Sequence, residues 1–577
     1  MHPGKRLSTL LSALFCLTAL ATTFAGCGGS TSTSTTTKPT KAPAGKQVYR
    51  YPLETPDIAS FDPGQATDLY SIPAIQMVFT GLVQLDDSLK VQPQLAQSYD
   101  ASSDGLSYTF HLRSNLKFSD GAPLTSQDVI YSIDRALSPQ ISNLNGVSLT
   151  YLGLIKDSAG RTTGKVKSLI NDSLMAPDPN TVIIKLNKAT GYFLEALTYP
   201  AAFVVEKSVI DRWGLRWVDH LNDNGGQGGD GPFKVTKYDH NIGIDFVPNA
   251  DYYGPHPQLQ HVRFLFFKDR KTSYSAYEAS QVDSTNIPTS NYDQAKNSTK
   301  EFHKVPSLWI NYYSMNYLVK PFDNIKIRQA FALAIDKDAI TRAIWHDQYV
   351  ATNHIVPQGM PGYNPNLTGP DGEKKTSGNE AMAKQLFTQG LQEEGLTLAN
   401  FPTINFAYSN SQQEIANEVT TVIGMWQRVL GVTSIKPEAL AFNELLKQIV
   451  NTTNTTSLTL WRVDWIADYP DPQDWLTLQF DKNAPNNNMN YGQNKSTNAD
   501  KQQATQQQME KADATLTQAT RFQIYNQAEQ QLVNDVAWIP VQQVTVTSLL
   551  KPNVVGVINN AVSLTPPNDW ANIYISQ

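Results

Sequence analysis

Residues 403–436 read TINFAYSNSQQEIANEVTTVIGMWQRVLGVTSIK, and they indicate the class of fold most directly. The first part, 403–409, has the composition of a strand. Residues 411–430 carry apolar side chains at helical spacing, and the extended residues 432–436 follow. A strand, a helix and a strand in this order predict a βαβ unit, and therefore a parallel or mixed sheet.

Two helices carry explicit start signals. Ser411 followed by Glu414 predicts a capping box for the helix just described, and Gly431 predicts its end. Thr125 followed by Asp128 predicts a second capping box ahead of another amphipathic segment.

Strand and helix patterns are mixed along the rest of the chain. Residues 106–113 and 262–266 alternate apolar with polar side chains, as half-buried strands do, and 458–465 is a further strand candidate. Residues 327–335 have the spacing of a helix. We therefore expect an α/β fold.

The composition narrows the range of functions. The chain has 577 residues, 40% hydrophobic and 17% charged, which is typical of a globular protein of several domains. Its net charge is −6, so the chain lacks the excess of basic residues that is typical of nucleic-acid-binding proteins. Its two cysteines, Cys16 and Cys27, exclude a disulfide framework and a cysteine-rich metal cluster.

The amino terminus has the pattern of a targeting segment. Lys5 and Arg6 precede a largely apolar stretch, 7–24, which predicts a secretory signal peptide over 1–26. Residues 28–45 are rich in Ser, Thr, Gly, Pro and Lys and predict a flexible tether.

Ala25-Gly26-Cys27 resembles a bacterial lipoprotein cleavage box. The resemblance implies that Cys27 becomes the first residue of the mature chain and carries lipid. The protein would then be extracytoplasmic and lipid-anchored to the bacterial cell membrane, in the periplasm or on the outer face. Ordinary secretion with an incidental cysteine is the alternative.

No pattern for catalysis is convincing. Gly226, Gly228 and Gly231 match G-x-G-x-x-G, but the residues that follow are extended where that fingerprint needs a helix. The H-E-x-x-H and G-x-S-x-G motifs are absent from the sequence. The acidic run from Asp464 to Asp474 is interrupted by prolines and lacks the ligand order of a calcium loop. We expect no catalytic residue, cofactor or metal.

Seven blocks, taken in order, resemble the large peptide-type solute-binding proteins of ABC importers, the oligopeptide and dipeptide receptors of bacterial extracellular solute-binding protein family 5. The blocks span nearly all of 46–577: SFDP (60–63) with TGLV (80–83), LA (95–96) through YTFHLR (108–113) and KFSDG (117–121), GPF (231–233), NADYYG (249–254), PFD (321–323) with AIDK (334–337), WIADYPDP (465–472), and 525–540 ending in WIP.

This resemblance implies a two-lobed, periplasmic-binding-protein-like fold with an extra subdomain and a hinge between the lobes. The chain would cross between lobes near 305–306 and 540–541. The expected parts are lobe one (46–72, 195–305 and 542–577), the extra subdomain (73–194) and lobe two (306–541).

The resemblance also indicates the ligand site. Asp468 matches the family's acidic residue that pairs with the α-amino group of a bound peptide, and it follows a strand candidate at its carboxyl end, where α/β proteins bind ligands. Trp465 and Tyr469 belong to the same block. We expect them either to line the ligand site or to pack in the hydrophobic core. Arg462 either meets the ligand's carboxylate or forms a structural salt bridge. We expect Asn490 to contribute to the cleft.

The expected function is the capture of short peptides with a free amino terminus in an interlobe cleft, by a monomer that delivers them to an ABC permease and its ATPase subunits. The first alternative is the same fold with another solute: a nickel complex, haem, an oligosaccharide or an opine. A secreted hydrolase is a remote second.

Overall fold

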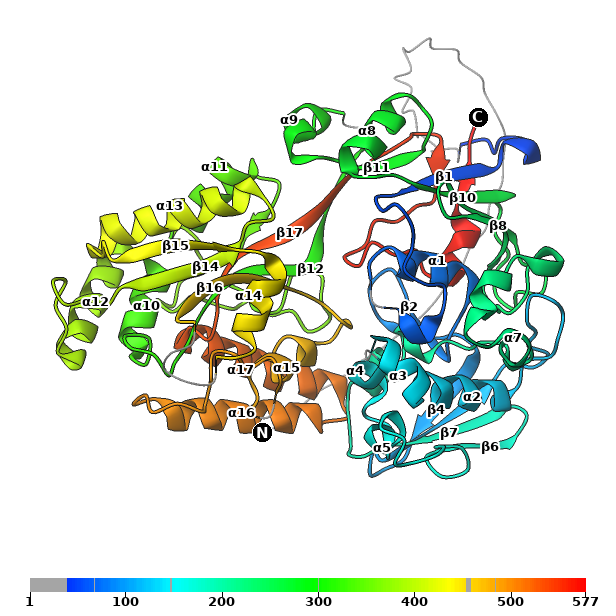
Figure 1. Cartoon of the computed structure of the whole chain (residues 1–577), viewed down its shortest axis with the longest axis horizontal. Helices are drawn as coiled ribbons and strands as arrows, with labels where there is room; N and C mark the ends of the chain where they lie inside the picture. Colours follow the sequence, from blue (N-terminus) through cyan, green and yellow to red (C-terminus); the bar gives the residue numbers. More distant parts are fainter. Residues whose placement is uncertain (1–38, 67, 146–147, 299, 453–457, 483) are drawn as a thin grey trace, which may run out of the picture. The chain divides into compact units, whose positions relative to one another are not determined.

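The computed structural model describes residues 39–577 except 67, 146–147, 299, 453–457 and 483. The signal peptide and Cys27 lie outside the described residues. Helices and strands are interspersed along the chain, which confirms the α/β prediction (Figure 1). No helix of the described part is long and apolar enough to cross a membrane.

A seven-stranded mixed sheet forms one half of the fold. Its strand order is β11-β17-β12-β16-β14-β15, and β13 pairs with β17. Strand β14 runs parallel to β15 and β16, so the predicted βαβ unit is confirmed, with α13 as its crossover. The bounds are β11 (Ser284–Asn286), β12 (Phe302–Met315), β13 (Val350–Ala351), β14 (Ile404–Ser409), β15 (Ile435–Leu440), β16 (Leu460–Ile466), β17 (Ile539–Leu550) and α13 (Gln413–Leu430).

The start of α13 differs from the prediction. Gln412 is its N-cap, and the Ser411 capping box is wrong because the Ser411 hydroxyl pairs with that of Ser409 at the end of the preceding strand. Gly431 ends the helix in the left-handed conformation, as predicted. The Thr125–Asp128 capping box is also confirmed.

Two smaller four-stranded sheets lie in the other half. The first has the order β1-β10-β9-β8, and the second β4-β5-β7-β6. The glycines at 226–231 lead into strand β8 rather than a helix, which removes the dinucleotide fingerprint. The bounds are β1 (Val48–Leu53), β8 (Phe233–Asp239), β9 (Gly243–Pro248), β10 (His261–Phe266), β4 (Ala96–Ala101), β5 (Ser107–Leu112), β6 (Leu174–Asp178) and β7 (Thr181–Lys185).

The remaining strands are short, and most of the helices cover the sheets (Figure 1). The elements are β2 (Val83–Leu85), β3 (Val91–Pro93), β18 (Val554–Val555), β19 (Tyr574–Ile575), α1 (Ser71–Val78), α2 (Ser126–Ala136), α3 (Pro139–Asn145), α4 (Ser148–Leu152), α5 (Ser158–Thr162), α6 (Phe193–Ala196), α7 (Lys207–Trp213), α8 (Arg270–Glu278), α9 (Tyr292–Ala295), α10 (Ile325–Leu333), α11 (Lys337–Trp345), α12 (Glu380–Glu394), α14 (Phe442–Ile449), α15 (Thr477–Phe480), α16 (Ala499–Asp513) and α17 (Gln518–Asp535).

The three larger sheets pack against separate main hydrophobic clusters. One cluster packs around the β4-β5-β7-β6 sheet, and a second around the β1-β10-β9-β8 sheet. The seven-stranded sheet contributes mainly to two other clusters, one containing Phe406 and Trp426 and the other Ile310 and Trp461, while Leu549 and Leu550 at the end of β17 join two further clusters. These clusters do not test the predicted lobe boundaries, which stay a prediction.

Strands β12 and β17 run antiparallel over a long distance and connect the seven-stranded sheet with the other half (Figure 1). Their register shifts between Pro306 and Ile310, close to one predicted crossing. Such an interruption weakens the ladder locally and gives a place to bend.

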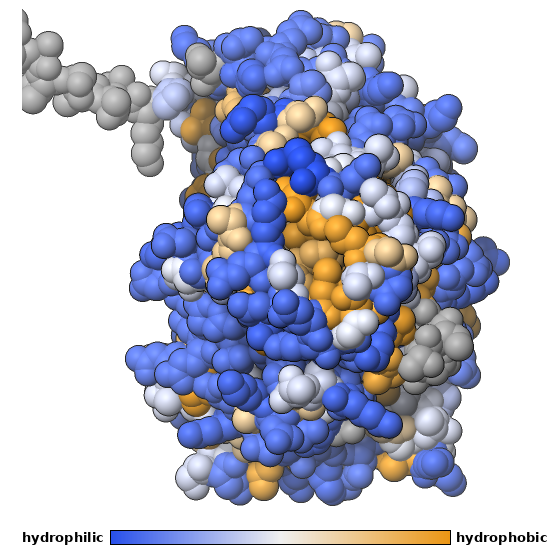
Figure 2. Space-filling model, turned by 90° about the vertical axis from the view of Figure 1, so that its left-hand side faces the viewer, coloured by the Kyte–Doolittle hydropathy of each residue, from blue (hydrophilic) through white to orange (hydrophobic). Residues whose placement is uncertain are grey.

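The predicted tether extends too far at its carboxyl end. Ala42 is buried, its N–H donates to the carbonyl of Ile575 (2.8 Å), and Lys41 forms a β-bridge with Ser576. The chain is therefore held to the last strand from Lys41 onward. Figure 2 shows one face of the molecule, on which hydrophilic residues surround an apolar area.

Candidate ligand-binding site

Asp468 lies just beyond β16, at the carboxyl end of that strand as predicted. Its Oδ1 accepts a hydrogen bond from the hydroxyl of Tyr151 (3.2 Å), and its N–H donates to Oδ2 of Asp474 (3.2 Å). Burial raises the pKa of Asp468 to about 6, while the Tyr151 hydrogen bond acts in the opposite direction. At neutral pH the carboxylate is still mainly ionised.

Aromatic rings pack together next to this carboxylate. Tyr151 stacks on Tyr199 with ring centroids 3.4 Å apart, and Tyr469 stacks on Tyr192 at 5.8 Å. Tyr151 also meets Tyr469 edge-on, at 6.4 Å. Tyr469 itself is buried, and its hydroxyl bonds to Gln473. The rings reduce the access of water, so a charge that meets Asp468 is held in a low-dielectric setting.

Asp474 accepts hydrogen bonds from two residues of the 465–472 block, Trp465 and Asp468. The indole N–H of half-buried Trp465 donates to Oδ2 of Asp474 (3.1 Å). Oδ1 of Asp474 is buried without a hydrogen-bond partner among the described residues. Burial and the nearby charge of Asp468 raise the pKa of Asp474 well above its ordinary value. Burial and the neighbouring Asp468 thus disfavour a second negative charge at this place.

Arg462 is engaged elsewhere. Its Nε lies 3.2 Å from Oε1 of Glu418, and its side chain is only 5% exposed. Glu418 also accepts hydrogen bonds from Tyr313 (2.9 Å), Trp345 (2.8 Å) and Gln542 (2.9 Å). This geometry matches the structural salt bridge of the two alternatives, since a ligand carboxylate would have to compete with Glu418.

Asn490 lies in the asparagine-rich loop, as the sequence predicts. Its amide donates to Oδ1 of Asn316 (3.1 Å) and to the carbonyl of Thr452 (2.6 Å). These bonds hold the loop in place. A direct role in the cleft stays a prediction.

The other acidic residues of the run face different partners. Asp464 accepts from the indole of Trp309 (2.9 Å), and Asp471 pairs with Arg521. Arg521 also pairs with Glu195 (3.2 Å). Within the described part of the chain, no three His, Cys, Asp or Glu side chains are grouped so as to hold a metal ion.

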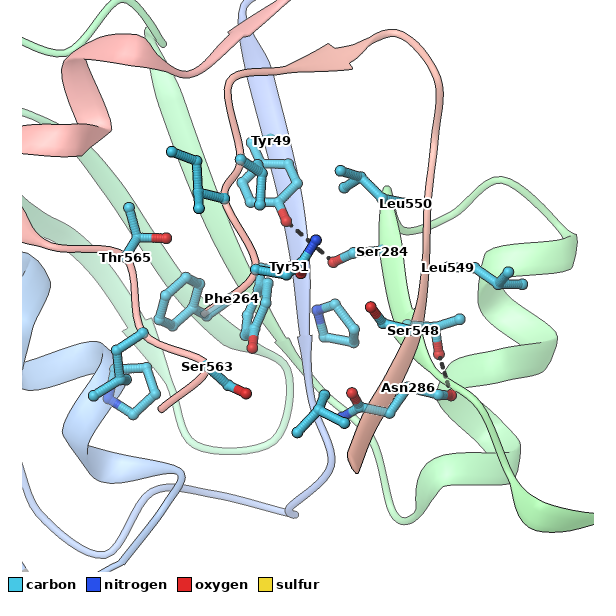
Figure 3. A pocket seen from close by; sticks show the side chains of 18 of the residues that line it. Tyr49, Tyr51, Phe264, Ser284, Asn286, Ser548, Leu549, Leu550, Ser563 and Thr565 are labelled. Carbon is cyan, nitrogen blue, oxygen red and sulfur yellow. Dashed lines mark hydrogen bonds between the residues drawn. The ribbon is translucent and has the colours of Figure 1, made fainter. Parts of the chain in front are cut away.

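Tyr151 and Tyr199 were missed from the sequence. Tyr151 is separated from Asp468 by 317 positions, and neither tyrosine lies in a block that suggests a ligand. A pocket lined by residues of β1, β11 and β17 was missed as well (Figure 3). Asp468 is not among the residues that line it.

The chain was compared with known proteins. Residues 90–487 match the model of bacterial extracellular solute-binding proteins, family 5 Middle. The oligopeptide-binding protein OppA of Bacillus subtilis is 26% identical over 541 residues, covering 92% of this chain and 93% of OppA. The dipeptide-binding protein DppE of the same organism is 27% identical over 512 residues, covering 87% of this chain and 88% of DppE.

A solved structure shows the same fold. The unliganded open form of MppA, a periplasmic murein tripeptide-binding protein, has a TM-score of 0.76 at 24% identity, covering 93% of this chain and 99% of that chain. The two-lobed, periplasmic-binding-protein-like α/β fold expected from the sequence is therefore confirmed. On the extent of the family match, this chain belongs to the bacterial extracellular solute-binding proteins of family 5.

Proposed function

We propose that this protein captures short peptides with a free amino terminus and delivers them to an ABC permease driven by separate ATPase subunits. The observation that carries the proposal is the half-buried, ionisable Asp468 at the end of β16, next to a group of aromatic rings. Among the described residues, Tyr151 is the one side chain that donates a hydrogen bond to it. Within the part of the chain that the structure describes, no Lys, Arg or His side chain forms an ion pair with it.

A peptide's α-ammonium supplies that missing cation. It is charged at neutral pH and carries N–H donors suited to a carboxylate. Exclusion of water strengthens this contact. A ligand with a blocked amino terminus would leave Asp468 buried and unpaired, which costs on the order of several kcal/mol.

The family and its relatives support the same class of ligand. OppA and DppE of Bacillus subtilis are named as an oligopeptide- and a dipeptide-binding protein. A monomer anchored through lipid at Cys27 would hold the site outside the cytoplasm, near its permease. Closure about β12 and β17 would follow from ligand contacts to both lobes, because only differential contacts shift a conformational equilibrium. The protein then binds and releases its ligand without a catalytic step.

Native mass spectrometry of the protein as isolated, followed by calorimetry, tests the proposal. Tri- to pentapeptides with free amino termini should bind saturably. A nickel complex, haem, a maltooligosaccharide and an opine serve as the rival ligands. Binding of one rival with no binding of any peptide would overturn the assignment.

A further inference from the structure

A second, differently built pocket opens where two strand edges separate. Strands β1 and β11 lie side by side at Arg50 and Asp283: the N–H of Asp283 donates to the carbonyl of Arg50 (2.9 Å), and the N–H of Arg50 donates to Oδ2 of Asp283 (2.7 Å). Beyond this point no backbone hydrogen bond joins the two strands in the described chain. A pocket with about 890 Å³ of empty space, part of it open to solvent, lies there (Figure 3).

The lining of this pocket carries no charged side chain. Four aromatic rings contribute to it, and the hydroxyl of Tyr49 donates to Oγ of Ser284 (3.2 Å). The other polar groups are neutral hydroxyls and amides, several of which Figure 3 shows around the space. The aromatic residues are Tyr49, Tyr51, Phe264 and Trp570, and the neutral polar residues are Gln76, Ser284, Thr285, Asn286, Ser548, Asn559, Ser563 and Thr565.

The backbone of β11 adds hydrogen-bonding groups. Lys551 donates to the carbonyl of Asp283, and Ile287 donates to that of Thr547, which fixes the alternation of the β11–β17 ladder. In an antiparallel pair the residues between such bonded positions point their N–H and C=O groups to the other side. Ser284 and Asn286 hold those positions, so their backbone groups point away from β17.

Ala66, near the Asp468 site, and Pro73, at the pocket, lie only seven positions apart in the chain. The hydroxyl of Tyr199, which stacks on the Tyr151 ring beside Asp468, donates to the carbonyl of Ala66 (2.9 Å). Seven residues further on, Pro73 lines the pocket. Seven residues span at most about 24 Å, so an extended ligand of comparable length could approach both places.

We propose that this pocket is a second binding region, which takes an uncharged, largely apolar side chain of the bound peptide and rejects Asp, Glu, Lys and Arg. The inference rests on the proposed peptide-binding function. A charged side chain would be desolvated there without an opposite charge, which is costly. An aromatic or aliphatic side chain instead gains burial against the rings, and the neutral polar groups accommodate the adjoining main chain.

Ser548 gives a matched pair of variants. It lies half-buried on β17 and lines the pocket, so Ser548→Asp introduces a carboxylate while Ser548→Asn adds similar bulk without charge. The probes are free-amino alanine peptides of three to eight residues, with one Phe, Lys or Asp moved along the chain, titrated by calorimetry.

In the wild-type protein, Phe at one position should bind at least about tenfold more tightly than Lys or Asp at that position. Ser548→Asp should weaken binding of the Phe peptide and strengthen binding of the Lys peptide, so the ratio of the two affinities should fall at least about tenfold. Ser548→Asn should leave that ratio within about threefold of the wild-type value. Equal affinities at every position, or an equal effect of Ser548→Asp on Phe and Lys peptides, would overturn the inference.

A neutral aromatic dye separates this inference from the proposed function. N-phenyl-1-naphthylamine should bind with an affinity that Ser548→Asp lowers and Asp468→Asn leaves unchanged. Dye binding of this kind without any peptide binding would overturn the peptide proposal and support a pocket for neutral groups. Peptide binding that needs the free amino terminus but ignores Ser548→Asp, together with the same dye affinity in both proteins, would overturn the pocket alone.

Discussion

The affinity for free-amino peptides should fall steeply in mild acid. Burial raises the pKa of Asp468 to about 6, and the ligand's ammonium pairs with the ionised carboxylate. With that pKa, about nine tenths of Asp468 is ionised at pH 7 and about one tenth at pH 5. Affinity should therefore be roughly tenfold weaker at pH 5 than at pH 7, with a maximum near pH 7, because the α-amino group loses its charge as the pH approaches about 8.

Calorimetry across this pH range, in buffers of different ionisation heat, gives the affinity and the number of protons released. Below pH 6 binding should release a proton, because the ammonium displaces it from Asp468. Asp468→Asn is the control, since it lacks the titrating group but keeps Asp474 and Tyr151 beside it. An affinity that does not change between pH 5 and pH 7, or an equal slope in the variant, would refute the reasoning.

Three further outcomes follow from the geometry. Tyr151→Phe removes the hydroxyl that stabilises the ionised Asp468, so the midpoint of the affinity–pH curve should move upward by about one unit; an unchanged midpoint would count against the contact. Glu418→Ala leaves Arg462 buried without its carboxylate, and urea denaturation should show a loss of about 3–5 kcal/mol; a loss below about 1 kcal/mol would contradict a buried pair. Burial lowers the pKa of Lys337 to about 7, so the wild-type protein should lose about 2 kcal/mol of stability from pH 9 to pH 7, as the folded state resists protonation; Lys337→Met should lack this loss, and parallel profiles would disprove it.

Local patterns predicted the elements well. The alternation in residues 106–113 and the periodicity between 411 and 430 correspond to β5 and α13, since one buried face imposes each pattern. The cap at Ser411 was wrong because a hydroxyl two residues away competes for it. Propensity alone does not report that competition.

The site was only partly predictable. Asp468 could be singled out as a candidate because it lies in a conspicuous block at the end of a strand. The tyrosines that surround it come from α4 and from residues near α6, far away in the chain. The neutral pocket is built from the edges of β1, β11 and β17, whose approach depends on tertiary pairing. No local pattern carries that information.

The most direct measurement pairs each peptide with its N-acetylated form and titrates both against the wild-type protein and Asp468→Asn. Acetylation should weaken binding to the wild-type protein at least about tenfold and have little effect on the variant, whose unfolding transition should match that of the wild-type protein. Equal affinity of the two forms for the wild-type protein, or an equal loss in both proteins, would contradict the role assigned to Asp468.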